Sequence, residues 1–505
     1  MSNIFGSYGG FFSRMDDMST YYNKYKTSNG YKYVLYNNYG YDQDEKLIYS
    51  MRATNLLDYL YSNLRDSYDE TQNRFINSIT LNVSLLDNLK FRGRVGSDYT
   101  GWSASDKEHN TEPTTLGYTG VYAAEQRNNN VTYGDVLLTY NPKVSKDLDL
   151  SLTGGASGRK QTYLYQKTST NSGLVDENWF SLQNSAGTVT AQSARATQLD
   201  VAAFGMLNLS YKSFLYLEAT GRYEGTSTLP SGVNTYFYPS VNAGFVFSDV
   251  FKMPSWMNYG KLRASYGLTG NHPPIYAANV AYNQNAVVYD NANILYQQPN
   301  ASSFGNNNIV SEQKRESEIG LEARFLEGRI GVDFSYYNNR VNKQILTAST
   351  PPSSGATSEL MNAGSLSNYG WEAAITATPV QKKDFRWNTR FNFAINRNKL
   401  LALNGLTSLT DNVEGGGYLI LRSEIGDALG NIYVHPQTSD ANGNKIVNSD
   451  GYYTVDANNY KYVGNILPKV VGGFSNTFTY KAFALDFTLD YRFGGKLVSI
   501  PTYYQ

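Results

Sequence analysis

The clearest pattern in the sequence is an alternation of apolar and polar residues with a period of two. In the stretch "FALDFTLDYRF" (483–493), one parity is apolar and aromatic: Leu485, Phe487, Leu489, Tyr491 and Phe493. The other parity is polar or charged: Asp486, Thr488, Asp490 and Arg492. Because successive side chains of a strand point to opposite faces, this stretch predicts a β-strand with one apolar face.

The same alternation recurs along the chain in pairs of segments. Each pair is joined by a short connection, and together they predict seven antiparallel hairpins, or fourteen strands, with connections at 85–88, 143–147, 212–213, 250–258, 326–328, 380–384 and 481–483. The connections between hairpins are long, polar and rich in Asn, Ser, Gly and Tyr. They cover roughly 99–130, 159–197, 269–314 and 397–467.

Short connections therefore alternate with long ones, which is typical of transmembrane β-barrels with tight periplasmic turns and long extracellular loops. Segments of about 9–11 residues are long enough to cross the apolar part of a bilayer as tilted strands. The fold class predicted is all-β, an antiparallel transmembrane β-barrel. The alternative is a large soluble β-sandwich, propeller or solenoid, but a propeller should repeat motifs at a fixed period, and we find none.

The amino-acid composition further limits the class of protein to which the chain can belong. The 505 residues include 44 Tyr and 44 Gly against 14 Pro, and tyrosine is favoured where one end of a side chain is apolar and the other wet. With 43 basic and 43 acidic residues, the net charge of +0 predicts no nucleic-acid partner. The chain has no cysteine, which excludes disulfides and Cys-ligated metals. No run of about 18 apolar residues exists, which excludes helical membrane spans but not strands.

Several segments resemble one family of barrels. They read "LRASYGLTGN" (262–271), "SEQKRESEIGLEARFLEGRIGVDFSYYNN" (311–339), "NAGSLSNYGWEAAITATPV" (362–380), "SEIGDALGNIYV" (423–434) and "GNILPKVVGGFSNTFTYKAFALDFTLDYRFGGK" (464–496). In this order they resemble the barrel of the SusC/RagA family, the TonB-dependent outer-membrane importers of Bacteroidetes. The resemblance is most specific from about 258 to 496, weaker from 75 to 250, and faint over 1–74.

That resemblance implies a barrel of about 22 strands whose lumen is closed by a plug domain. Fourteen strands are fewer, and nothing in the sequence resembles a plug, a TonB box or a signal peptide. We therefore expect an internal piece of such a barrel, with strands missing at each end and the plug absent. The expected organisation is an extracellular loop and poorly defined region at 1–74, barrel hairpins with long extracellular loops at 75–496, and the start of a truncated loop at 497–505.

The sequence offers no pattern for catalysis or for a cofactor. The three histidines, His109, His272 and His435, lie in expected loops without partners at metal-ligand spacing. The segment "SDANGNKIVNSDG" (439–451) resembles a calcium loop, but when the loop is numbered from Asp440, Gly443 stands at position 4 and Gly451 at position 12, so a hairpin tip with an Asn-Gly turn explains it better.

The carboxylates Glu318 and Glu322 share one face of an expected strand, with Arg324 beyond them and Asp333 across the hairpin. Paired carboxylates are also the arrangement used by glycoside hydrolases. On a barrel wall, we interpret them as lumen-facing residues balanced by a nearby arginine, and we expect no enzyme.

Aromatic residues of the expected loops are the candidates for contact with a substrate or a partner, because exposed rings can stack on sugars or pack against peptide side chains. The rings selected are Tyr99, Trp102, Tyr118, Tyr122, Trp179, Tyr276, Tyr282 and Tyr289. The alternative is that these rings only stiffen long loops or touch a partner protein.

The resemblance implies TonB-dependent import of oligosaccharides or peptides across the bacterial outer membrane. A SusD-like surface lipoprotein would capture the substrate, TonB would act through the missing plug, and this chain would supply barrel wall in contact with outer-membrane lipid. A passive porin or structural barrel is the alternative from another class. A barrel enzyme would need a clustered acid–base or nucleophile constellation near the rim, which the sequence does not contain.

Overall fold

The computed structural model describes residues 18–23, 25–32, 51–279, 282–289, 292–299, 304–412 and 419–498. Three short 3-10 turns and two helices accompany the strands; the helices are α2 (Met18–Asn23) and α3 (Met51–Arg65), and the turns are η1 (Leu182–Asn184), η2 (Phe247–Asp249) and η3 (Pro352–Ser354). None of the helices in these ranges is long and apolar enough to cross a bilayer.

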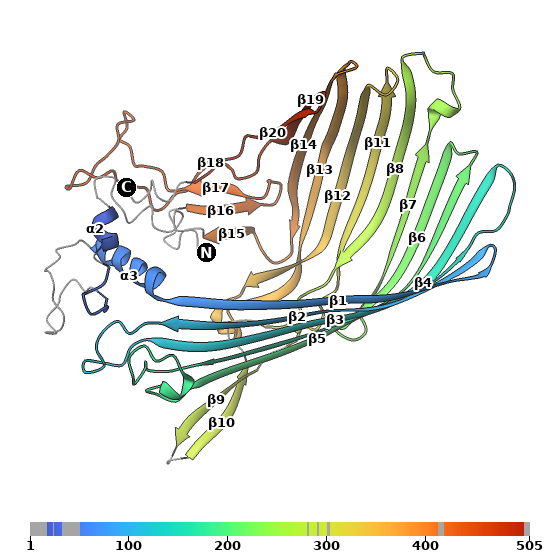
Figure 1. The fold of residues 1–505 in the computed structure, drawn as a ribbon. Coiled ribbons are helices and arrows are strands. Elements are labelled where there is room, and N and C mark those ends of the chain that lie inside the picture. Colours follow the sequence, from blue (N-terminus) through green and yellow to red (C-terminus); the bar gives the residue numbers. More distant parts are fainter. Residues whose placement is uncertain are drawn as a thin grey trace.

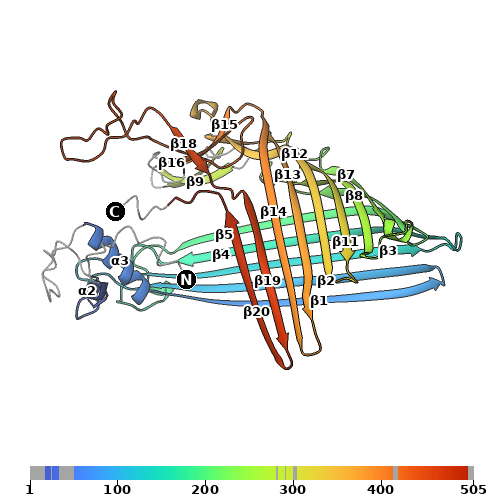
Figure 2. The same ribbon diagram turned by 90° about the horizontal axis from the view of Figure 1, so that it is seen from above.

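One antiparallel sheet of fourteen strands dominates the fold, as the sequence predicted. Its strands, in spatial order, are β1 (Ser67–Leu86), β2 (Leu89–Glu108), β3 (Val121–Tyr140), β4 (Leu148–Ser169), β5 (Thr190–Tyr211), β6 (Leu215–Thr226), β7 (Thr235–Phe245), β8 (Met257–Asn271), β11 (Glu312–Phe325), β12 (Ile330–Ser349), β13 (Ser358–Gln381), β14 (Phe385–Leu403), β19 (Val470–Tyr480) and β20 (Phe483–Phe493). Each strand pairs with its neighbour in the chain, apart from two insertions. The sheet twists and curls along its width, so that β1–β5 and β11–β14 run in very different directions (Figures 1 and 2).

The two insertions carry small sheets of their own. A hairpin of β9 (Tyr282–Tyr289) and β10 (Ala292–Pro299) lies between β8 and β11. A four-stranded sheet lies between β14 and β19 and comprises β15 (Ser408–Asn412), β16 (Leu419–Glu424), β17 (Asn431–Val434) and β18 (Lys461–Asn465). This sheet and α3 lie at the end of the wall opposite the short turns (Figure 1).

Several boundaries differ from those expected. The predicted loop at 99–130 is mostly strand, because β2 continues to Glu108 and β3 begins at Val121. The loop expected at 159–197 shrinks in the same way to the segment between Ser169 and Thr190. These strand extensions are rich in Asn, Gln, Ser and Thr, so they lack the apolar face by which strands were recognised. Likewise β1 begins at Ser67 rather than near 75, and α3 precedes it.

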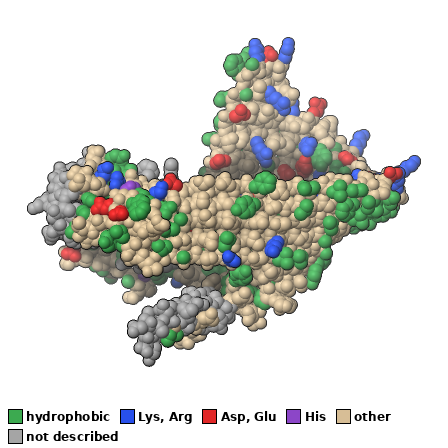
Figure 3. Space-filling view, turned by 60° about the horizontal axis from the view of Figure 1, so that its bottom comes forward, with side chains coloured by type: hydrophobic (Ala, Val, Ile, Leu, Met, Phe, Trp, Pro, Cys, Tyr) green, Lys and Arg blue, Asp and Glu red, His purple; other side chains and the backbone are tan. Residues whose placement is uncertain are grey.

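The apolar outer face covers only part of this wall. Large exposed apolar side chains on β1–β3 lie toward the short turns: Phe75, Ile79, Leu81, Val95, Val136 and Leu138. On the same face, farther from the turns, the residues are polar: Ser103, Ser105, Gln126, Asn128 and Asn130. Figure 3 shows this division, with hydrophobic side chains gathered toward the end of the wall at the right.

Strand lengths agree with that division. β1 has 20 residues, or about 66 Å at about 3.3 Å per residue, whereas the apolar band of a transmembrane barrel is about 25 Å tall. Even with a strand tilt of about 40°, the first five strands continue well beyond such a band. The wall therefore has a membrane part near the short turns and an extramembrane part near the loops.

Candidate functional site

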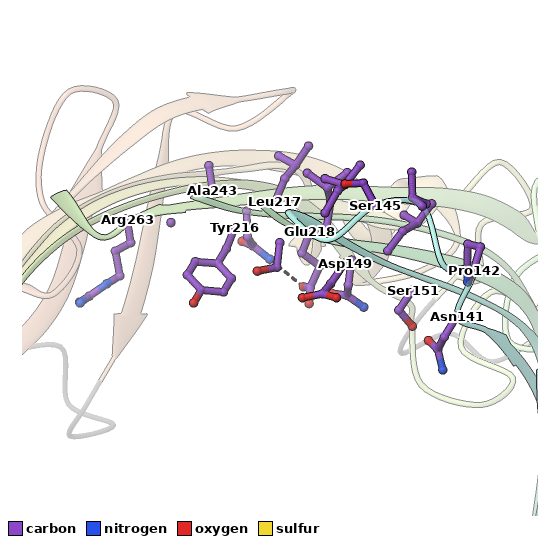
Figure 4. Close-up of a pocket in the computed structure, with 18 of the residues that line it drawn as sticks. Asn141, Pro142, Ser145, Asp149, Ser151, Tyr216, Leu217, Glu218, Ala243 and Arg263 are labelled. Atoms are coloured by element: carbon purple, nitrogen blue, oxygen red, sulfur yellow. Dashed lines mark hydrogen bonds between the residues drawn. The ribbon is translucent and has the colours of Figure 1, made fainter. Parts of the chain in front are cut away.

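The candidate site is the face of the sheet opposite the apolar one, called the inner wall below. Figure 4 shows the division directly: Tyr216, Glu218 and Asp149 project from one side of the strands, and Leu217 and Ala243 project from the other. The pairing register continues this alternation across the sheet, because Glu218 pairs with Asn208 on β5 and with Asn242 on β7. The inner wall is therefore polar from strand to strand.

Arg263 on β8 organises the centre of the inner wall. Its guanidinium lies 2.7 Å and 3.2 Å from the two carboxylate oxygens of Asp333 on β12, and its Nε lies 3.5 Å from Glu318 on β11. The residue paired with Arg263 on the intervening strand is Gly320, and a side-chain carbon there would overlap the guanidinium. The missing side chain at Gly320 therefore lets one arginine bind carboxylates on two strands.

Other inner-wall charges are also matched within the wall. Arg92 and Arg94 both bind Asp135, at 2.8 Å and 2.7 Å. Further pairs of the same kind are Arg74–Asp98, Arg159–Asp200, Arg222–Glu224, Lys314–Glu316 and Arg324–Glu322. Exposed pairs of this kind contribute little to stability, about 0–1 kcal/mol each. Their main effect is to present a polar surface whose arginine charges are largely neutralised.

The structure confirms that arginines balance these carboxylates, but it corrects which arginine binds which carboxylate. Glu318 and Asp333 are balanced by an arginine, but that arginine is Arg263 rather than Arg324, which binds Glu322 instead. Arg263 was missed because it lies on another hairpin. Its alternation with the outward Leu262 in "KLRASYG" was the available signal.

A cavity of about 1120 Å³ lies beside the short-turn end of the inner wall. The turn between β3 and β4, residues 141–146, forms one side, and β4–β8 form the other, down to Arg263 and Glu318 (Figure 4). Within it, Asn242 Nδ2 donates to Glu218 at 3.0 Å. The cavity combines hydroxyl, amide and charged groups without a nucleophile–base pair.

At the opposite end of the wall, hydrogen bonds join the β2–β3 loop to the β4–β5 loop. Asn110 and Asn178 form a reciprocal pair, in which each backbone N–H donates to the other side-chain oxygen at 2.9 Å. Tyr61 of α3, which is 1% exposed, donates its hydroxyl to the Asn110 carbonyl at 2.6 Å. Asn178 adopts φ +57°, which asparagine tolerates better than most residues. The β2–β3 and β4–β5 loops are thus tied together and to α3.

A partly buried acid, Asp66, lies in the same cluster. Asp66 accepts a hydrogen bond from the backbone N–H of His109 at 2.8 Å. Burial raises the pKa of the Asp66 carboxyl, and burial together with the nearby Arg65 lowers the pKa of the His109 imidazole.

The structure places the sequence-predicted aromatic residues in three environments. Tyr99 and Trp102 lie in β2 and Tyr122 in β3, so their expected loop position is wrong. Tyr99 points to the outer face, where its hydroxyl donates to Asn128, whereas Trp102 is on the inner wall.

The remaining candidates lie farther apart. Tyr118, Trp179 and Tyr276 are true loop residues, each more than half exposed. Tyr282 and Tyr289 lie in β9, and their side chains fall outside the described residues. The six of these rings that the structure describes therefore form no single cluster. The neighbours that Trp102 does have were missed: Tyr68 on β1 and Arg127 on β3, whose guanidinium also lies near Tyr165 on β4.

The segment 439–451 forms a hairpin tip, as predicted. Asp440 Oδ1 accepts from the backbone N–H groups of Asn442 and Asn444, and Gly443 has φ +85°. The hydrogen bond from the Asn444 side-chain amide, together with those from the backbone, lowers the pKa of Asp440. Across the ranges that the structure describes, no group of three His, Cys, Asp or Glu residues is placed to hold a metal ion.

The three histidines make ordinary contacts. His272 Nδ1 lies 2.9 Å from the Thr228 hydroxyl, and His435 Nδ1 lies 2.8 Å from the Asn459 carbonyl. His109 packs edge-on against Phe180. Each of these contacts is structural.

A curved antiparallel wall with an apolar outer band, a polar inner face, short turns at one end and long loops at the other defines an outer-membrane β-barrel protein. The chain belongs to the family described as TonB dependent receptor-like, beta-barrel, whose model matches residues 7–501. This is a family of outer-membrane receptors and not of enzymes.

Curated relatives support the assignment. The chain is 27% identical over 453 residues to TonB-dependent receptor P3 of Formosa agariphila, covering 82% of this chain and 44% of that protein. It is 27% identical over 322 residues to TonB-dependent receptor SusC of Bacteroides thetaiotaomicron, covering 59% of this chain and 31% of that protein. The chain thus spans less than half the length of these two relatives.

Solved structures show the same fold. The structure of the RagAB peptide transporter superposes with a TM-score of 0.75 at 18% identity, covering 92% of this chain and 51% of that chain. The 'open-open' state of the RagAB peptide importer superposes with a TM-score of 0.73 at 19% identity, covering 92% and 50%.

Proposed function

We propose that this protein takes part in TonB-dependent import of oligosaccharides or peptides across the outer membrane. The observation that carries the proposal is the match to the receptor family over nearly the whole chain, combined with an inner wall on which many arginines are paired with carboxylates. Such a wall presents hydrogen-bonding groups to a passing substrate without binding it as an ion.

In this proposal the chain supplies barrel wall and outer loops and performs no covalent chemistry. A SusD-like surface lipoprotein would dock at the loop end, where α3 and the small sheet of β15–β18 lie (Figure 1). TonB would supply the energy through the plug domain of the whole receptor. Likeness to SusC and to the RagAB transporter supports the two-component arrangement.

The test is uptake in the native bacterium. Deletion of the gene should abolish growth on the relevant oligosaccharide or peptide as sole carbon source, and a strain with intact receptor but no functional TonB should show the same loss. Uptake that persists without TonB would contradict energised import and favour the passive porin instead. Complementation with the intact gene is the control for effects on neighbouring genes.

A further inference from the structure

Four adjacent strands bring three aromatic rings and one arginine together on the inner wall. Trp102 on β2 pairs with Arg127 on β3, and Arg127 pairs with Tyr165 on β4. Tyr68 on β1 lies beside Trp102, with 6.4 Å between ring centroids. The residues Tyr68, Trp102, Arg127 and Tyr165 are called the aromatic platform below.

Polar contacts hold the platform in place. The Arg127 guanidinium lies 4.3 Å from the centroid of Trp102 and 5.6 Å from that of Tyr165, and it is bound by Glu125. Trp102 Nε1 donates to the Glu70 carboxylate at 3.3 Å. Rings held by such contacts lose little conformational freedom when a ligand stacks on them.

The platform lies in the extramembrane part of the wall. On the outer face at the same level stand Gly101, Ser103, Gln126 and Asn128, beyond the last apolar residues of β2 and β3. A ligand arriving from outside therefore meets the platform before it reaches the membrane part. Tyr68 is 54% exposed, so its ring remains open for contact.

The charges of the platform discriminate between ligand classes. Its single cation, Arg127, already binds Glu125 and already occupies the cation position over Trp102. It offers no free cation for the carboxylates of a peptide. The Glu70 and Glu125 carboxylates are hydrogen-bond acceptors that suit the hydroxyl donors of an uncharged polyol.

We propose that the aromatic platform is a stacking site for a sugar ring of a neutral oligosaccharide. The apolar C–H face of the ring would lie on Tyr68 and the adjoining edge of Trp102, Tyr165 would lie beneath the next sugar unit, and the hydroxyls would donate to Glu70 and Glu125. This inference rests on the proposed import function and names the substrate class of the same barrel.

The test is isothermal titration calorimetry on the full-length receptor in detergent. The probes are neutral α-glucan, β-glucan, xylan and mannan oligosaccharides, with casein peptides as the competing class. Trp102→Ala should weaken the best oligosaccharide about tenfold, since a ring contact is worth about 0.5–1.5 kcal/mol and about 1.4 kcal/mol is tenfold. Trp102→Phe should restore most of the affinity.

Tyr99→Ala is the matched control, because Tyr99 lies three residues away on β2 but on the outer face, and its removal should change affinity less than about twofold. Equal losses in both variants, no binding of any oligosaccharide, or peptide binding that depends on Trp102 would each overturn the proposal. Because binding is measured without TonB, failure of energised uptake in cells leaves this result intact, and the two proposals fail separately.

Discussion

Arg263 on β8 binds Asp333 on β12, two strands away, because the residue between them is Gly320. Glycines on this wall therefore help to determine where side chains of the neighbouring strands lie, because they leave space for them. The same relationship recurs where Tyr133, Tyr238 and Tyr337 lie over glycines of the next strand, at Gly96, Gly270 and Gly370 respectively. Rings laid over glycines cover the backbone that the glycines leave bare.

Gly320→Val should displace Arg263 and break its contact with Asp333. Overpacking of this kind costs about 1–3 kcal/mol, and we expect the loss as a lower midpoint in thermal or denaturant unfolding of the receptor. Gly154→Val is the control, because a side-chain carbon at Gly154 meets nothing within 4 Å. An equal effect of the two substitutions would contradict the role of Gly320.

Val136→Arg should destabilise the inserted protein strongly. Val136 lies on the outer face of β3 within the apolar band, where a lipid-facing arginine costs about 2–4 kcal/mol near the bilayer midplane. Gln126→Arg lies on the same face of the same strand, beyond the band, and should have little effect. Folding into lipid vesicles, followed by denaturant titration, measures both. Similar costs would place the membrane boundary elsewhere.

Asn110→Ala should loosen the contact between the β2–β3 and β4–β5 loops. The substitution leaves the Asn178 backbone N–H without its acceptor, at a cost of about 1–3 kcal/mol. We expect faster hydrogen exchange over 109–120 and 170–189. The hydrogen bond from the residue 110 N–H to Asn178 Oδ1 survives this substitution, so adding Asn178→Ala should remove a second bond and speed exchange further. Exchange in the double variant no faster than in Asn110→Ala would contradict the contribution of the second bond.

Asp66→Asn should make the His109 region more stable at neutral pH and leave it unchanged in acid. Burial raises the pKa of Asp66 in the folded protein above its ordinary value of 3.8, so the charged carboxylate destabilises the fold above that range. The penalty disappears as pH falls and the carboxyl is protonated in both states. Asparagine keeps the oxygen that accepts from His109. Hydrogen exchange at the two pH values should show a gain only near neutrality; equal gains at both would contradict a charge effect.

The membrane part of the wall could be predicted from the sequence because burial in lipid imposes an alternation that is visible in residues such as Leu485, Phe487 and Leu489. Beyond the band both faces are polar, as at Gln126 and Asn128, so the alternation vanishes and these strand extensions looked like loops. Helix α3 was missed at the same end, where long polar segments obscure a modest amphipathic pattern.

The candidate site was only partly predictable. Trp102 was selected as a single aromatic residue, but the other platform residues, Tyr68, Arg127 and Tyr165, come from three other strands. Their convergence depends on the pairing register, which a single sequence does not specify between hairpins. The partner of Asp333 was missed for the same reason.

Cysteine accessibility along β2 tests most directly the claim that one face of this wall meets lipid and the other an aqueous path. These 505 residues contain no cysteine, so each introduced thiol is the only one on this part of the receptor. In outer membranes, we predict that Val95→Cys resists a water-soluble maleimide, whereas Arg94→Cys on the inner wall and Ser103→Cys beyond the band react readily. Reaction of Val95→Cys at the rate of Ser103→Cys, with Arg94→Cys protected, would contradict the account.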